Sequence, residues 1–146
     1  MRASHGFSLL EVLVAIVVVA TGVLGVAALQ IMTMQNNTSA LFRTQATQLA
    51  YDIIDRARAN PDGDYAVALA DAAPAIPNCM SQDCAPAEMS DYDLGVWLSD
   101  VITTLPDGDG EITMNGNLLT VTVQWDDSRD ALDAPLRASV TTALAP

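Results

Sequence analysis

The strongest constraint on this chain is an almost uninterrupted apolar run at residues 7–29, close to the N-terminus. The run reads FSLLEVLVAIVVVATGVLGVAAL and contains one charged residue, Glu11. At about 1.5 Å per residue, a helix of this length crosses the roughly 30 Å hydrocarbon core of a bilayer. Arg2 and the N-terminal amine precede the run, and positive charge there favours retention of that end in the cytoplasm. The sequence therefore predicts a single membrane span with the rest of the chain outside the cytoplasm.

The small residue that could mark a cleavage site, Gly6, comes before the apolar run rather than after it. A secretory signal peptide has the opposite order, with a short apolar core followed by a small-residue site. This order disfavours a conventional signal peptide.

Composition excludes several classes of function. The chain has 146 residues, with six arginines, no lysine and 18 acidic residues, for a net charge of -12. Nucleic-acid binding needs a positive surface that displaces counterions, so no direct nucleic-acid contact is expected. The single histidine, His5, lies ahead of the apolar run, and only two cysteines are present. These residues offer little material for a metal site or a histidine-dependent catalytic centre, and neither an enzyme activity nor a cofactor is expected.

The motif G-F-S-L-L-E at 6–11, followed by a spanning apolar helix, resembles the signal of type IV prepilins and pseudopilins. The resemblance implies that a membrane prepilin peptidase cuts after Gly6 and that the new N-terminal amine, on Phe7, is methylated. It also implies that the Glu11 carboxylate pairs with the N-terminal amine of a neighbouring subunit and so sets subunit registry. An alternative explanation is that Glu11 lies within a turn of the interface, where it snorkels or is protonated.

One long helix is expected over residues 7–59. Beyond the apolar run, no strong helix breaker appears before Asn60-Pro61. Apolar residues recur there at helical spacing on one face, at Phe42, Ala46, Leu49, Ile53 and Ala57. Asp52 and Arg56 form a favourable i,i+4 pair on another face. We expect a leader at 1–6, a membrane or filament-core helix at 7–29, a periplasmic helical half at 30–59 and a head at 60–146.

The stretch from Asn60 to Pro86 is rich in proline and is expected to be a loop. It contains Cys79 and Cys84, which the predicted topology places in an oxidising compartment, where a disulfide is expected. Metal binding is the competing interpretation, but C-x4-C without another thiol or a near histidine is a poor zinc site.

A second helix is expected after Ser90-Asp91-Tyr92-Asp93, which can cap it, and it runs through Trp97 to Leu105. Strands are expected at 111–114, 118–125 and 136–144, the second with strict alternation, and Asn115-Gly116 predicts a hairpin between the first two. Trp97 and Trp125 are interpreted as core anchors. The fold class is therefore α+β, with a long N-terminal helix packed on a small antiparallel sheet, as the resemblance to pilins also implies.

Two acidic segments remain. The sequence DGDGE at 107–111 could suggest a calcium loop, but it lacks the later bidentate glutamate of an EF-hand, and a polar turn explains it more simply. Asp126 to Asp133 is interpreted as a solvated acidic loop, with a partner surface as the alternative.

Several downstream segments resemble the PilV-type minor pilins; they are AYDIIDRARANP at 50–61, the Cys pair, D-L-x-x-W at 93–97, LPDG at 105–108 and VTVQWDD at 121–127. The resemblance implies a minor pilin, inserted in the bacterial inner membrane and then incorporated into a pilus. The implied partners are prepilin peptidase, major and minor pilins and, in some members, a tip adhesin. The implied roles are pilus assembly, adhesion and twitching motility. The alternative is a minor pseudopilin of a type II secretion system.

Overall fold

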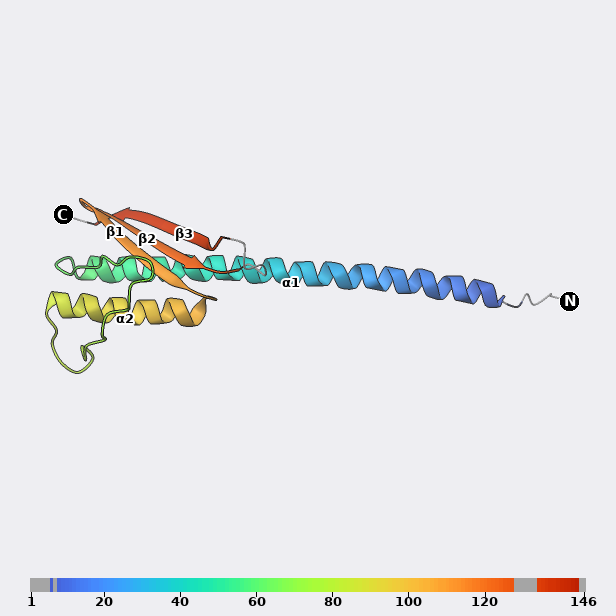
Figure 1. Ribbon diagram of the computed structural model, residues 1–146, viewed down its shortest axis with the longest axis horizontal. Coiled ribbons are helices and arrows are strands. Elements are labelled where there is room, and N and C mark those ends of the chain that lie inside the picture. The colour runs from blue at the N-terminus through green and yellow to red at the C-terminus, as the bar shows by residue number, and fades with distance from the viewer. Residues whose placement is uncertain (1–5, 7, 128–133, 145–146) are drawn as a thin grey trace. The chain divides into compact units, whose positions relative to one another are not determined.

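The computed structural model describes residues 6, 8–127 and 134–144 (Figure 1). The elements follow the order α1 (Leu9–Ala59), α2 (Pro86–Thr104), β1 (Asp109–Asn115), β2 (Leu118–Trp125) and β3 (Leu136–Ala143). The chain divides into two compact units, Met1–Ser39 and Ala40–Pro146, and the division falls within α1. Each unit is described by itself below.

In the first unit, the described residues form the N-terminal part of α1. This helix is long and apolar enough to span a membrane, with a mean hydropathy of 2.8 over its most apolar 18-residue window, of which none is buried. The hydroxyl groups of Thr21, Thr33 and Thr38 donate to carbonyl groups one turn earlier, so these polar side chains are satisfied within the helix. Within this unit, the described residues leave the apolar surface of the helix exposed.

In the second unit, α1 buries one face. Ala46, Ala50, Ile53, Ile54 and Ala57 are at most 2% exposed, whereas Phe42 and Leu49 are partly buried. The helical face predicted from sequence is thus confirmed. Because its buried positions are three alanines and two isoleucines, the sheet and α2 can approach the helix closely at the alanines and still find larger apolar side chains to pack against.

The strands form one antiparallel sheet in the order β1-β2-β3. Asn115 pairs with Leu118 at the hairpin and Leu118 pairs with Ala143, so β2 is the central strand. Gly116 has a φ of 63° at the first central position of the two-residue turn, where type II′ hairpin turns require glycine. The hairpin predicted at Asn115-Gly116 is confirmed.

The core of the head lies between one face of the sheet and the two helices, which run side by side beneath it (Figure 1). Trp97 and Trp125 are at most 1% exposed, as predicted for core anchors. The Trp97 indole N–H donates to the Leu49 carbonyl at 2.9 Å and joins α2 to α1. A Cβ atom at Gly110 would overlap the Trp97 ring, so β1 can lie on this ring only because residue 110 has no side chain.

The predicted start of the second helix is wrong. The helix α2 begins at Pro86, whose fixed φ suits the first helical position, and Glu88 accepts a hydrogen bond from the Ala85 N–H at 3.0 Å. Ser90 therefore lies within the helix, buried, and its hydroxyl donates to the Ala87 carbonyl instead of capping the helix. The strands agree with the prediction, although β1 begins two residues earlier than expected, at Asp109.

Candidate functional site

The first candidate region is the start of α1. Gly6 is exposed, and a Cβ atom built on it would meet nothing within 4 Å. Phe7, the predicted site of methylation, lies outside the described residues. No described residue covers Gly6, so its backbone is exposed to a protease, as cleavage requires.

Ser8 closes the first turn of α1. Its carbonyl accepts the N–H groups of Glu11 and Val12 at 3.0 and 3.2 Å, and its hydroxyl accepts the Leu10 N–H at 3.4 Å. Glu11 consequently stands in the first helical turn, where the positive end of the helix dipole favours a carboxylate.

Glu11 borders an apolar groove on the helix surface. The groove is lined by Glu11, Val12, Ala15, Ile16, Val19 and Ala20. Small side chains on such a stripe allow a second helix to approach closely. A helix packed there would lie beside the Glu11 carboxylate, the one acidic group of the described apolar segment.

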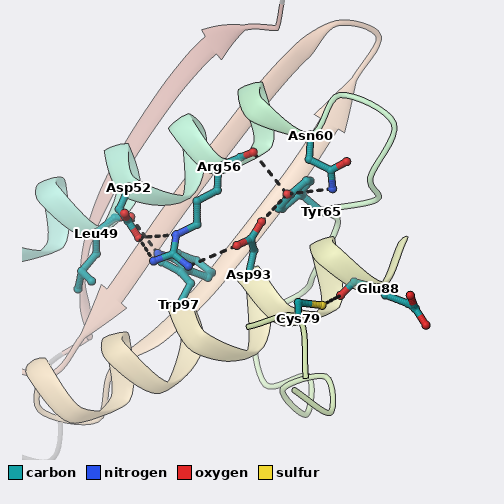
Figure 2. A network of polar contacts seen from close by, with 9 residues as sticks. All are labelled: Leu49, Asp52, Arg56, Asn60, Tyr65, Cys79, Glu88, Asp93 and Trp97. Atoms are coloured by element: carbon teal, nitrogen blue, oxygen red, sulfur yellow. Dashed lines mark hydrogen bonds and ion pairs between the residues drawn. The ribbon is translucent and has the colours of Figure 1, made fainter. Parts of the chain in front are cut away.

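The second candidate region is a polar network that joins α1, α2 and the loop between them (Figure 2). Arg56 contacts the carboxylates of Asp52 at 2.9 Å and of Asp93 at 3.4 Å. Burial lowers the pKa of Arg56, but the hydrogen bonds and charges of Asp52 and Asp93 outweigh it and leave this pKa raised. The sequence predicted only the Asp52–Arg56 pair, on an exposed face, whereas the structure ties Arg56 to α2 as well.

Tyr65 completes the network from the loop. Its hydroxyl donates to Asp93 Oδ2 at 2.7 Å and accepts the Asn60 side-chain amide at 3.3 Å. Burial and the hydrogen bond to Asp93 raise the pKa of Tyr65 to about 12. Tyr65 and Asp93 are buried and Arg56 is partly buried, and each finds its polar partners within the network, so the role of the network is to fix α2 against α1.

Sequence reasoning missed this role of Asp93, which it assigned to a helix cap. A signal was present, because Asp93 falls on the same helical face as Ser90, Leu94 and Trp97, all of which are buried. A carboxylate on an apolar face needs a buried partner. The sequence does not indicate which arginine or tyrosine supplies it.

The predicted disulfide is present. Cys79 and Cys84 are joined, with their Cα atoms 5.5 Å apart. The Cys79 sulfur lies 3.8 Å from the Glu88 carbonyl oxygen, which places the disulfide loop beside the first turn of α2 (Figure 2). The bridge therefore restricts the loop that leads into α2.

The structure describes the first of the two acidic segments fully and the second only in part. Asp109 caps the backbone N–H groups of Gly110 and Ala70 at 2.8 Å, so its carboxylate stabilises the turn and the adjoining loop. Among the described residues, no group of three or more histidine, cysteine or acidic side chains is placed to hold a metal ion. In the other segment, the Asp126 N–H donates to the Pro106 carbonyl, and residues 128–133 lie outside the described part of the chain.

Comparison with known families gives two adjoining matches. Residues 1–27 match the prokaryotic N-terminal methylation motif, and residues 28–95 match a family described as Tt1218-like, type IV pilin Tt1218. No curated protein and no solved structure matches the chain. The first match covers the start of α1, and the second covers the rest of α1, the disulfide loop and the first half of α2.

Proposed function

We propose that this chain is a type IV pilin, a structural protein rather than an enzyme, and that it serves as a minor pilin. Residues 28–95 match the Tt1218-like type IV pilin family and residues 1–27 match the N-terminal methylation motif. Prepilin peptidase cuts the inserted precursor after Gly6, and Phe7 is then methylated. The mature chain leaves the bacterial inner membrane for the pilus, where it contributes to assembly and so to adhesion and twitching motility.

One observation carries this proposal. The apolar part of α1 has no cover in its own unit and begins within the methylation-motif match, and it holds a single carboxylate, Glu11, in its first turn. An unpaired carboxylate within a membrane-spanning helix costs about 2.5–3.5 kcal/mol on insertion scales. Cleavage after Gly6 would create an N-terminal amine that can offset this cost on an adjacent subunit.

The head supports a role in assembly rather than in catalysis. The polar groups of the network, partly buried at Arg56 and buried at Tyr65 and Asp93, are occupied in holding two helices together. The described residues therefore offer the neighbouring subunits a rigid surface, while the apolar part of α1 offers them lateral packing.

The test replaces Glu11 in the full chain and measures processing and incorporation separately. Intact mass of the membrane-extracted chain reports cleavage and methylation, and immunoblotting of sheared filaments reports incorporation. For Glu11→Ala we expect normal cleavage after Gly6 and about a tenfold or greater loss of filament incorporation, equivalent to about 1.4 kcal/mol or more.

The matched control is Glu11→Asp, which keeps the charge and should retain most of the incorporation. Wild-type incorporation by Glu11→Ala would remove the charge-pairing argument. A mature chain that still begins at Met1, in cells with active prepilin peptidase, would refute the proposal as a whole.

A further inference from the structure

Helix α1 begins shortly after the proposed cleavage point. Gly6 and Ser8 both lie outside the helix, whose first residue is Leu9. Gly6 is exposed, and within the described part of the chain its carbonyl oxygen accepts no hydrogen bond. The peptide unit that prepilin peptidase would cut therefore starts just ahead of the helix, with its carbonyl oxygen free.

The Leu10 N–H determines whether that oxygen stays free. In an α-helix the N–H of residue i donates to the carbonyl of residue i−4, so a helix extended toward the N-terminus would bond the Leu10 N–H to the Gly6 carbonyl. In the structure, the Ser8 hydroxyl accepts this N–H instead, at 3.4 Å. The Ser8 carbonyl accepts the next two N–H groups, of Glu11 and Val12, at 3.0 and 3.2 Å. Ser8 thus takes the donor that a longer helix would give to Gly6.

The residue types around Ser8 favour a helix boundary at this position. Serine is among the preferred N-cap residues, and Ser8 and Glu11 have the S-x-x-E spacing of a capping box. Glycine is a poor helix former, so Gly6 opposes extension of the helix from the other side. The cap matters most close to a bilayer. A free N–H is costly in an apolar environment, and extension of the helix is the other way to satisfy the N–H groups of its first turn.

Cleavage of a peptide bond acts on the carbonyl group that Ser8 leaves free. Water adds to the Gly6 carbonyl carbon, the bond from this carbon to the Phe7 nitrogen breaks, and the nitrogen takes up a proton. The products are a Gly6 carboxylate and a Phe7 amine. Negative charge develops on the Gly6 oxygen during the reaction and has to be stabilised by hydrogen-bond donors of the peptidase. An oxygen that already accepts the Leu10 N–H within a helix would be less available to those donors.

From these observations we propose that Ser8 is a positioning residue for cleavage by prepilin peptidase. Its hydroxyl holds the Leu10 N–H and so keeps the Gly6 carbonyl out of the helix and open to the enzyme. Ser8 acts through this N–H and does not need to touch the reacting atoms. This inference rests on the proposed function, since it assumes that prepilin peptidase cuts after Gly6.

The first experiment measures cleavage of the full-length precursor in membranes that contain prepilin peptidase. The initial rate at which the mature N-terminus appears is followed by intact mass. Ser8→Ala removes the capping hydroxyl, and the matched control, Ser8→Thr, keeps one. We expect Ser8→Ala to be cut about fivefold more slowly than the wild type, equivalent to about 1 kcal/mol, which is the typical effect of an N-cap. Ser8→Thr should stay within about twofold of the wild-type rate.

A second pair of variants separates this role from a direct contact between Ser8 and the peptidase. Leu10→Pro removes the N–H in question, and a proline ring clashes with the carbonyl four residues earlier in a helix, which here is that of Gly6. Proline is tolerated in the first turn, so α1 can still form. Ser8→Ala added to Leu10→Pro should therefore cause no further slowing. Equal slowing by Ser8→Ala with and without Leu10→Pro would overturn the proposal, as would a wild-type rate for Ser8→Ala alone.

The state of the Gly6 carbonyl can also be measured without the peptidase. Gly6-Phe7 is the one Gly-Phe step in the chain, so ¹³C-carbonyl glycine combined with ¹⁵N-phenylalanine gives a single NMR cross peak from the scissile peptide. In micelles, the carbonyl signal should move downfield, as expected on hydrogen bonding, in Ser8→Ala and not in Ser8→Thr. An identical signal in the wild type and Ser8→Ala would overturn the proposal, even if Leu10→Pro abolished cleavage. A wild-type chain left uncut after Gly6 would refute the proposed function instead, while the NMR comparison still decides whether Ser8 keeps the carbonyl free.

Discussion

Raising the pH through the range in which tyrosine ionises should destabilise the head by way of Tyr65. Its pKa is raised from 10.0 to about 12 by burial and by the hydrogen bond to Asp93, so the folded state favours the neutral phenol. The resulting stabilisation is fully present below pH 10 and is lost as the pH rises to about 12. A difference of about 2 between the pKa of Tyr65 in the folded and unfolded states corresponds to about 2–3 kcal/mol of unfolding free energy.

The assay is denaturant unfolding of the full chain in detergent micelles, followed by the fluorescence of the buried Trp97 and Trp125 at several pH values. The chain has no lysine, so lysine ionisation does not obscure this range. The control is Tyr65→Phe, which should be about 1.5–3 kcal/mol less stable at neutral pH because Asp93 loses a hydrogen bond.

The free energies of unfolding of the two proteins should converge near pH 12. At this pH the wild type loses the stabilisation that comes from the neutral Tyr65 hydroxyl, which the variant lacks at every pH. Tyr51 and Tyr92 are present in both proteins, so the comparison isolates Tyr65. An equal loss of stability by wild type and Tyr65→Phe between pH 10 and pH 12 would refute the assignment of the alkaline transition to Tyr65.

Two further perturbations test the packing of the head. Gly110→Ala should lower the free energy of unfolding by about 1–3 kcal/mol, because the new Cβ atom overlaps the Trp97 ring. The control is Gly22→Ala, whose Cβ atom meets nothing within 4 Å and should leave the thermal midpoint of the head unchanged. Equal midpoints for the two variants would contradict this account of the packing. Replacing Cys79 and Cys84 by serine should cost about 2 kcal/mol in denaturant unfolding, the entropy expected for so short a loop, and a reductant should then have no further effect. Unchanged stability of the double variant would show that the bridge does not restrict the unfolded chain.

Much of the fold could be predicted because it follows from local patterns. The apolar run and the spacing of Ala46, Ile53 and Ala57 predicted α1, and strict alternation in β2 predicted its limits, Leu118–Trp125, correctly. The disulfide was predictable because Cys79 and Cys84 lie close in the chain and had no alternative thiol partner.

The remaining features depend on contacts between residues far apart in the chain. The start of α2 was misplaced because Ser90-Asp91 is a plausible cap by itself, whereas Pro86 and Glu88 provide the actual start. The bond from Tyr65 to Asp93 spans 28 residues, and no local pattern specifies it. The bridge between Val67 and Ile112 likewise joins β1 to a distant part of the chain.

The continuity of α1 has a mechanical consequence. The helix that carries the apolar N-terminal segment is the same one whose buried face, from Ala46 to Ala57, anchors the head. A pull along the part of α1 that lies in the head would load these buried side chains in shear, all at the same time. Extracting this part of the helix from the head would therefore require many of these contacts to fail together.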